Sequence, residues 1–360
     1  MRTTNFGLSI VCSTPVNMSL FKDLFKKVIR NRKPDEDTVF VKGKPTPKYY
    51  GTVVPYPNFN ASSDASILQS AIEKDEVDND VIIAVLVKRS NEQRQKIKVV
   101  YEASTGKSLE KALKSALSSD LEDVSLALLM DPPHFDAYLL RKATKGFGTH
   151  EHVLVEVLAT RSNQEIREIK RVFKEEYQEE LEEVITEETS GDFTTALLAL
   201  LEAQKDESVE IDQDLARKDA EILFEAGETP KEPMFLPSST SCPNAAGRSS
   251  PRYYAAVSDI SLPKALDLEL NGDIEECLID IVKCSWNKAA VFAEKLHLAM
   301  KGYGTCEDTL IRVMVSRSEV DLKKIIEEYR AMYDVSLQEA ILMDTRGHYE
   351  SVLLGLCGAH

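Results

Sequence analysis

The sequence lacks a basic excess, long apolar runs and a clear secretory signal, and each absence excludes a class of protein. Its 360 residues carry 44 basic and 60 acidic side chains, a formal net charge of −16. Non-specific nucleic-acid binding needs the opposite balance, because an acidic surface repels phosphates. No apolar stretch approaches the roughly 20 residues of a membrane-spanning helix. The N-terminal stretch MRTTNFGLSIVCSTP resembles at most a poor signal peptide.

Cysteine is also sparse. The six cysteines form no Cys-x-x-Cys pair and no dense framework that disulfides would staple. This usage favours a reducing, intracellular compartment, so we expect a cytoplasmic protein. The cysteines are Cys12, Cys242, Cys277, Cys284, Cys306 and Cys357.

Catalytic and metal motifs are missing or incomplete. The string STGKS at 104–108 lacks the first glycine of a Walker A loop, whose place is taken by Tyr101. The string DEVDND at 75–80 lacks the glycine and the terminal Glu of an EF-hand. The six histidines show no zinc-binding spacing. Because no nucleophile–base pair or acid pair is legible either, we expect no enzyme.

What the sequence does contain is a repeated helical pattern. Three segments share an apolar stretch, an Arg-Ser pair, a polar turn and a second amphipathic stretch that ends near a tyrosine. Their arginines are Arg89, Arg161 and Arg317, separated by 72 and then 156 residues. A period of about 70 to 80 residues predicts four modules. Strand signals are scarce, so the expected class is all-α.

The third module departs from this pattern. Six prolines between positions 230 and 263 forbid continuous helix where its helix pair should stand. Either a loop-like segment replaces this part of the module, or residues 229–262 reflect a sequence error or an alternative exon. The expected organisation is a tail at 1–59, followed by modules at 60–132, 133–205, 206–288 and 289–360.

The tail contains a basic amphipathic segment at residues 18–30, MSLFKDLFKKVIR. Its leucine, phenylalanine, valine and isoleucine side chains share one helical face, and lysines and an arginine occupy the rest. Such a helix suits a partner's groove or a membrane surface, or it packs against its own core.

Two glycine strings, KGFGTH at 145–150 and KGYGTC at 301–306, are the candidate binding motifs of the chain. The first has two glycines of a dinucleotide fingerprint, but no strand precedes it and no third glycine follows. An acid stands forty residues beyond the second glycine of each string: Glu188 in ETSGDF and Asp344 in DTRGHY. Glycine turns direct carbonyl oxygens inward, and a carboxylate from another loop completes an oxygen-only shell. That shell suits Ca²⁺, with weak affinity because each site has one carboxylate.

With these features the chain resembles the annexin family. The motifs VPYPNFNASSD, ALDLELNGDIEECL and AEKLHLAMKGYGT are long and specific, and the resemblance covers nearly all of residues 60–360 except 229–262. It implies a curved disc of four modules of about five helices, with calcium loops on the convex, membrane-facing side.

The resemblance also implies two principal calcium sites, each built from three main-chain carbonyls and one carboxylate. The residues are Thr144, Gly146, Gly148 and Glu188 in the second module, and Met300, Gly302, Gly304 and Asp344 in the fourth.

Weaker sites are implied at two further places. Thr149 and Glu151 match a minor site beside the loop of the second module. In the first module, the carbonyls of Lys114 and Leu117 with the side chain of Glu122 match another.

Two modules lack the features of a principal site. The first has Glu76 where a glycine is needed and Ala116 at the position of the acid. In the third, Glu269 matches the acid, but Pro230 to Pro233 replace the glycine loop. We therefore expect no principal site in either module.

The tips of the two glycine loops carry aromatic residues. Phe147 and Tyr303 stand where the family places an apolar residue against lipid, although packing beneath the loop is the alternative. Cys306 occupies a position where the family often has an acid, either as a reactive thiol or as a passive substitution.

The expected function is therefore calcium-dependent binding of anionic phospholipid membranes, in which the cation bridges two acidic surfaces. The alternative is a soluble interaction scaffold with impaired membrane binding. The resemblance also implies inhibition of phospholipase A2 and binding of the tail helix by a dimeric EF-hand protein. It further implies a peripheral membrane location in calcium, with nuclear or non-classical extracellular pools.

Overall fold

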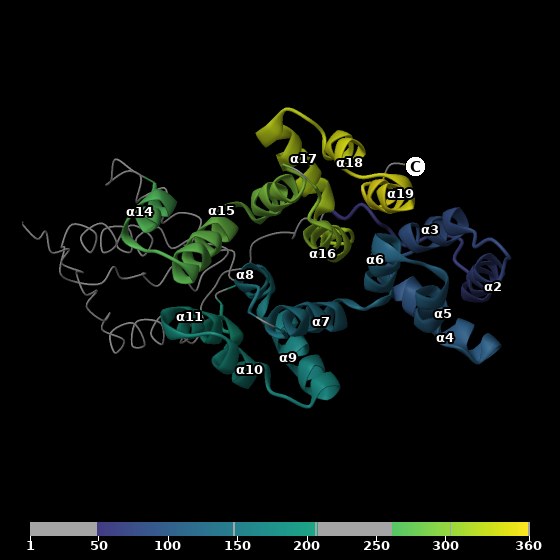
Figure 1. The fold of residues 1–360 in the computed structure, drawn as a ribbon, viewed down its shortest axis with the longest axis horizontal. Coiled ribbons are helices and arrows are strands. Elements are labelled where there is room, and N and C mark those ends of the chain that lie inside the picture. The colour runs from purple at the N-terminus through teal and green to yellow at the C-terminus, as the bar shows by residue number, and fades with distance from the viewer. Residues whose placement is uncertain (1–48, 147, 206, 208–260, 303, 359–360) are drawn as a thin grey trace, which may run out of the picture. The chain divides into compact units, whose positions relative to one another are not determined.

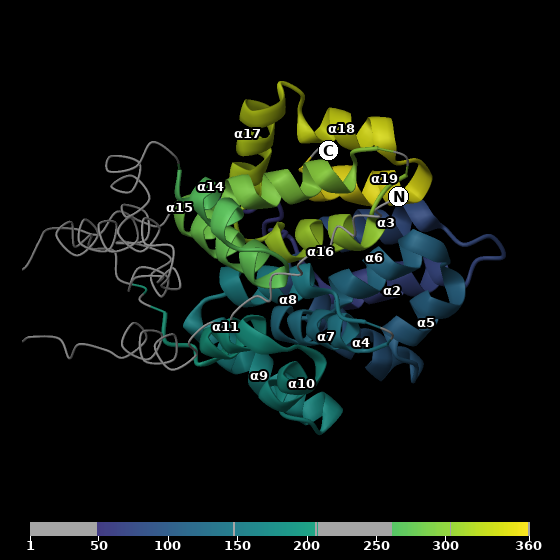
Figure 2. The same ribbon diagram turned by 60° about the vertical axis from the view of Figure 1, so that its left-hand side comes forward.

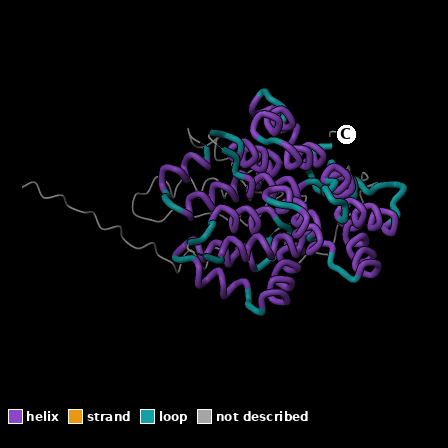
Figure 3. The backbone as a smooth tube through the Cα atoms, turned by 45° about the vertical axis from the view of Figure 1, so that its right-hand side comes forward, coloured by secondary structure: helices purple, strands orange, loops and turns teal. Residues whose placement is uncertain are grey.

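The structure is a computed structural model that describes residues 49–146, 148–205, 207, 261–302 and 304–358. Helices joined by short loops make up this part of the chain, and no strand occurs in it (Figure 3). None of its helices combines the length and the apolar character needed to cross a bilayer. The expectation of an all-α protein is confirmed.

The chain divides into two compact units. The larger spans residues 32–203 and 272–360, and the smaller spans 1–31 and 204–271. Among the described residues of the smaller unit, one helix is present, α14 (Leu262–Glu269). The predicted tail helix at 18–30 and most of the irregular stretch at 229–262 lie outside the described residues.

Among the described residues of the larger unit a five-helix arrangement occurs three times, as can be followed in Figure 1. We call the three groups the first, second and fourth modules, after their places in the predicted series. The first contains α2 (Ala61–Ile72), α3 (Asn79–Val87), α4 (Asn91–Thr105), α5 (Leu109–Ala116) and α6 (Ser119–Leu129). The second contains α7 (Pro132–Thr144), α8 (Glu151–Thr160), α9 (Asn163–Tyr177), α10 (Leu181–Glu188) and α11 (Gly191–Leu201). The fourth contains the second half of α15 (Asp273–Ala299), α16 (Glu307–Arg317), α17 (Leu322–Tyr333), α18 (Leu337–Asp344) and α19 (Gly347–Leu356).

The long helix α15 is two helices joined at a kink. Asn287 has non-helical dihedrals, φ −151° and ψ 88°, in the middle of the element. Its side-chain oxygen accepts a hydrogen bond from the main-chain nitrogen of Ala290 at 3.1 Å. Asp131 caps α7 in the same way, through the nitrogen of His134 at 3.1 Å. Asn287 is therefore the N-cap of the first helix of the fourth module.

The third helix of each module is delimited by its sequence. Ser90 and Ser162 begin α4 and α9 with capping boxes, in which the serine and a residue three positions later satisfy each other's main-chain nitrogen. The helices end at Gly106, Gln178 and Asp334, which all adopt the left-handed conformation. In the first and second modules the polar Ser/Asn break predicted between the two helices is therefore a helix start. In the fourth module Ser318 instead caps the end of α16, and α17 begins at Leu322.

The repeated arginine is a structural residue that is buried in the second and fourth modules and largely buried in the first. Arg89 makes two hydrogen bonds with Asp64 at 2.7 and 2.9 Å, and Arg161 makes two with Asp136, both at 2.7 Å. Although burial lowers the pKa of Arg161, the charge of Asp136 outweighs it and raises that pKa. Both pairs tie the first helix of a module to the end of its second helix.

In the fourth module the repeated arginine has different partners. Phe292 stands where the other modules have the aspartate, and the guanidinium of Arg317 lies over its ring at 4.8 Å. Arg317 donates instead to Asp321 at 2.8 Å.

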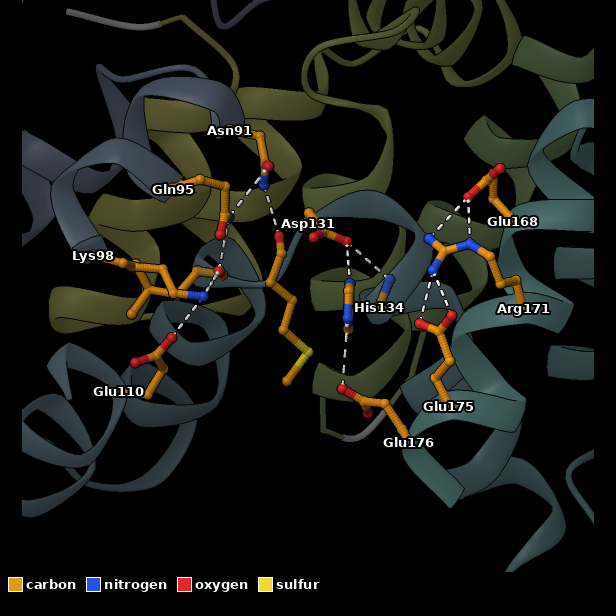
Figure 4. A network of polar contacts seen from close by, with 12 residues as sticks. Asn91, Gln95, Lys98, Glu110, Asp131, His134, Glu168, Arg171, Glu175 and Glu176 are labelled. Carbon is orange, nitrogen blue, oxygen red and sulfur yellow. Dashed lines mark hydrogen bonds and ion pairs between the residues drawn. The ribbon is translucent and has the colours of Figure 1, made fainter. Parts of the chain in front are cut away.

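The end of α6 is held by side chains from α4, as Figure 4 shows. Asn91 donates to the carbonyl of Met130 at 2.6 Å, and Gln95 and Lys98 donate to that of Leu129 at 2.9 and 3.0 Å. Carbonyls at a helix C-terminus have no partner within the helix, so these bonds allow the chain to turn directly into α7.

Ion pairs with buried arginines join the modules of the larger unit. Helix α16 packs against α6 and α7, and α15 packs against α8 (Figure 2). Across this junction Arg312 forms two hydrogen bonds with the buried Glu156, at 2.9 and 3.0 Å. Arg94 pairs with Glu319 at 2.8 Å and connects the first module to the fourth.

Candidate metal centres

The two glycine loops have the same local geometry. One lies between α7 and α8, and the other lies between α15 and α16. The main-chain nitrogen of His150 donates to the carbonyl of Ala143 at 2.9 Å, and that of Cys306 donates to Ala299 at 2.8 Å. Each loop is therefore a closed turn from the end of one helix to the start of the next.

Glycine is required at four positions in these turns. Gly146 and Gly148 have φ angles of 131° and 93°, and Gly302 and Gly304 have φ angles of 118° and 90°. A β-carbon added at any of them would meet no atom within 4 Å, so space is not the constraint. Residues with a side chain rarely adopt these angles, so the backbone conformation itself selects glycine.

The loops present main-chain oxygens to solvent. All four glycines are exposed, and no described residue donates a hydrogen bond to their carbonyls. Thr144 is the last residue of α7, and Met300 caps the end of α15. Carbonyls at a helix C-terminus lack partners within the helix and carry the negative end of its dipole. Both turns therefore favour a cation.

Each loop lies beside an acid at the end of a different helix. In the fourth module, the hydroxyl of Thr305 donates to the carboxylate of Asp344 at 2.7 Å. In the second module, the hydroxyl of Thr149 donates to the main-chain carbonyl of Glu188 at 3.0 Å. The structure thus brings together the glycine loops and the acids that stand forty residues beyond them.

The carboxylates of the two acids differ in how strongly their surroundings hold them. Asp344 is partly buried and is oriented by Thr305, whereas Glu188 is exposed. Within the described part of the chain, no ion pair or hydrogen bond involves the carboxylate of Glu188. One site is therefore preorganised, and the other has a side chain free to move toward a ligand.

Sequence reasoning assigned no role to Thr305. The signal was present, because both glycine strings continue with threonine and the second-module copy, Thr149, was already a candidate. The repeated threonine indicates a common task, which is to hold the end of the fourth helix against the glycine loop.

The turn after each acid is also shared. Gly191 and Gly347, three residues after the acids, have φ angles of 64° and 67°. The corresponding residue of the first module is Ser119, with a φ of 54°. The first module therefore keeps the turn with a residue that is strained in it.

The weaker candidate site of the first module lies at this turn. Lys114 is in the last turn of α5, Leu117 follows its end, and Glu122 is in the first turn of α6. The structure thus places all three around one helix–helix connection. In the second module Glu151 is the first residue of α8, two positions after Thr149.

The first module closes its loop without glycine. The nitrogen of Asp78 donates to the carbonyl of Ala71 at 3.1 Å, which matches the closing bond of the other loops. Lys74, at the position of the first glycine, forms an ion pair with Asp78 at 2.5 Å. This loop therefore lacks the glycines that turn main-chain carbonyls inward. Ala116 is the last residue of α5, whereas an acid is the last residue of α10 and of α18.

Several predicted residues fall outside the described part of the chain. They are Phe147 and Tyr303 at the loop tips, together with Pro230 and Pro233. The third-module acid, Glu269, is the last residue of α14.

The donor set fits calcium better than zinc. In the described residues no group of three or more histidine, cysteine, aspartate or glutamate side chains could hold a metal ion. Zinc sites are built from such groups, whereas calcium takes six to eight oxygens and accepts main-chain carbonyls. The sulfur of the exposed Cys306 contacts the hydroxyl of Thr309 at 3.2 Å.

Comparison with known proteins identifies the family and the fold. A sequence model described as Annexin matches residues 63–128, 135–200 and 291–356. Annexin A1 of Homo sapiens is 49% identical over 314 residues, which are 86% of this chain and 90% of that protein. The structure of annexin III has a TM-score of 0.82 at 40% identity and covers 86% of this chain and 97% of its own. Calcium-bound annexin (Sm)1 has a TM-score of 0.76 at 28% identity, with coverage of 86% and 93%. The chain belongs to the annexin family.

Proposed function

We propose that this protein binds anionic phospholipid membranes in a calcium-dependent manner through its second and fourth modules. One observation carries the proposal: in both modules a threonine hydroxyl joins a carbonyl-presenting glycine loop to a helix end with an acid. Annexins are calcium-dependent membrane-binding proteins and not enzymes, and one structural relative is described as calcium-bound.

The proposed ligands divide into main-chain and side-chain oxygens. The carbonyls of the helix end and of the two glycines form one side of each site, and the acid forms the other. Bound calcium supplies a divalent charge whose remaining positions accept water or lipid phosphate oxygens. This bridge overcomes the repulsion between an anionic bilayer and a chain of net charge −16. The ligands are Thr144, Gly146, Gly148 and Glu188, and Met300, Gly302, Gly304 and Asp344.

We also propose that the four predicted modules and the 1–59 tail describe the whole chain. The first and third modules then lack principal sites, and the minor sites at Glu122 and Glu151 contribute weakly. At the loop tips, Phe147 and Tyr303 contact lipid.

The finer parts of the function rest on the family resemblance. They are a regulatory tail whose helix at 18–30 binds a dimeric EF-hand protein, and inhibition of phospholipase A2. We propose a cytoplasmic location that becomes peripheral at membranes in calcium, with nuclear or non-classical extracellular pools. Deletion of residues 1–30 should abolish binding of the EF-hand protein and leave calcium-dependent vesicle binding intact.

Co-sedimentation with phosphatidylserine vesicles tests the main proposal. The wild-type protein should pellet with vesicles in calcium and return to the supernatant when a chelator is added. The double variant E188Q/D344N should lose most of this binding. Glu187→Gln is the matched control, because Glu187 is an exposed acid next to Glu188 that is not a proposed ligand. Absence of wild-type binding at millimolar calcium would favour the interaction scaffold instead.

A further inference from the structure

Two exposed apolar side chains lie directly before the acid of the fourth module. Leu342 and Met343 occupy the last turn of α18, and these residues are 52% and 76% exposed. Met343 is the most exposed of the large apolar residues in the described part of the chain. We call this pair the apolar doublet. Leu337 and Ile341 form the buried face of the same helix, so the doublet lies off the core.

Within the described residues the full apolar pair occurs only in the fourth module; before the third-module acid Glu269 only Leu268 is apolar, and it is 62% exposed. In the first module the corresponding positions are Lys114 and Ser115, and in the second they are Thr186 and Glu187. These polar residues suit a helix end that faces water. An apolar pair at the same place loses free energy in water unless some partner covers it.

The surroundings of the doublet identify that partner. Thr305 donates to Asp344 at 2.7 Å, which fixes the end of α18 against the glycine loop of the fourth module. The doublet is therefore adjacent to the proposed calcium carboxylate. Two residues beyond Asp344, Arg346 is exposed and has no ion-pair partner among the described residues. Apolar side chains beside an unpaired cation are typical of segments that lie in the interface of an anionic bilayer.

We propose that the doublet and Arg346 form a second membrane anchor of the fourth module. When the Asp344 site engages an anionic bilayer, Leu342 and Met343 enter the boundary between headgroups and acyl chains, and Arg346 pairs with lipid phosphate. The occupant is a bilayer and not a free phosphate, since only a bilayer covers the apolar surface. The inference rests on the proposed function, because calcium first brings this face to the membrane.

A tryptophan probe tests where the doublet goes. Trp286 is the single tryptophan of the chain, so Trp286→Phe gives a silent background. In that background Met343→Trp should show a blue-shifted emission, quenched by phosphatidylserine vesicles with brominated acyl chains, only in calcium. Val99→Trp is the matched control, because Val99 is 69% exposed on α4, which carries no proposed ligand. Unquenched Met343→Trp emission while the protein sediments with vesicles would overturn the anchor.

An affinity measurement in the chain that keeps Trp286 supplies the second test. At saturating calcium, L342Q/M343Q should bind phosphatidylserine vesicles about tenfold more weakly than wild type, which corresponds to the loss of roughly one well-buried apolar side chain. V99Q should bind as wild type. Equal affinity of L342Q/M343Q and wild type would reject the membrane anchor and leave the proposed function intact. Failure of wild type to bind vesicles in calcium would instead reject the proposed function on which it rests.

Discussion

At the scale of the residue, the two proposed sites use the same kinds of ligand, but only the acid of the fourth module is oriented before calcium binds. Asp344 is oriented by the hydroxyl of Thr305 before any ligand arrives. Glu188 has a longer side chain, and Thr149 reaches only its main-chain oxygen. Ordering a free glutamate costs conformational entropy on binding, so the fourth-module site should have the higher calcium affinity.

The threonines allow this difference to be measured. Thr305→Val removes a hydrogen bond to a charged group, so it should raise the calcium concentration at half-maximal vesicle binding by about three- to tenfold. The titration uses the E188Q background, in which only the fourth module keeps the acid of its calcium site. Thr149→Val in the D344N background is the control and should raise it less. An equal rise in the calcium midpoint for Thr305→Val and Thr149→Val would show that Thr305 does not orient Asp344 before calcium binds.

Ser119 gives a prediction about stability. It holds a left-handed conformation that Gly191 and Gly347 hold in the other modules. Ser119→Gly should therefore raise the free energy of unfolding by about 0.5–1 kcal/mol, because the glycine relieves the strain. Gly191→Ala should lower it by a similar amount, since no atom obstructs the added carbon and only the dihedral angle is strained. Urea unfolding of both variants measures the effect, and a destabilised Ser119→Gly would refute the assignment of strain.

At the scale of the element, a buried arginine anchors the second helix of each module. Asp136 and Arg161 are both almost fully buried, and they neutralise each other through two hydrogen bonds. Asp321, the partner of Arg317 in the fourth module, is more exposed. The same arginine is therefore held by a buried partner in one module and by a partly exposed one in another.

This contrast predicts unequal costs of removing the acid. Asp136→Ala leaves a buried guanidinium unpaired and should lower the free energy of unfolding by about 3–5 kcal/mol. Asp321→Ala should cost less, because Arg317 keeps its contact with the ring of Phe292. Thermal and urea unfolding would measure both. A cost for Asp321→Ala as large as that for Asp136→Ala would contradict the account.

The sequence predicted the parts of the fold that depend on local chemistry. Glycines with positive φ, serine caps and acids at helix ends recur at a fixed spacing, so their shared geometry was legible from the repeats. Pairs between modules were not, because a charged residue such as Glu156 has many potential partners along the chain. Its partner, Arg312, occupies the equivalent position of the fourth module, 156 residues away. They come together because α15 packs against α8 and α16 packs against α7 across the junction.

At the scale of the whole molecule, the junction between the second and fourth modules carries a buried charge cluster. Burial raises the pKa of Glu156, but the charge of Arg312 outweighs it, so the pKa lies below the 4.5 of an ordinary glutamate. Lys295 adds a weaker attraction at 3.8 Å. A carboxylate with a lowered pKa stabilises the folded state above pH 4.5, and this contribution is lost as the pH falls through the folded-state pKa.

The pH dependence of stability tests this cluster. At pH 7, Glu156→Gln should be about 3–5 kcal/mol less stable than wild type, because Arg312 is left buried without its charge partner. Below pH 4.5 the difference should shrink as Glu156 itself becomes protonated. Urea unfolding at a series of pH values measures both curves. A difference that stays constant down to about pH 3 would show that the carboxylate charge is not the stabilising feature.

The central claim is that each acid completes one calcium site and that the two sites together hold the protein on a membrane. A calcium titration of phosphatidylserine vesicle binding with wild type, E188Q, D344N and E188Q/D344N tests it most directly. The account predicts a rise in the calcium midpoint for each single variant, with the larger rise in D344N, and almost no binding by the double variant. A double variant that binds at the wild-type midpoint, or wild-type binding that survives a chelator, would contradict the claim.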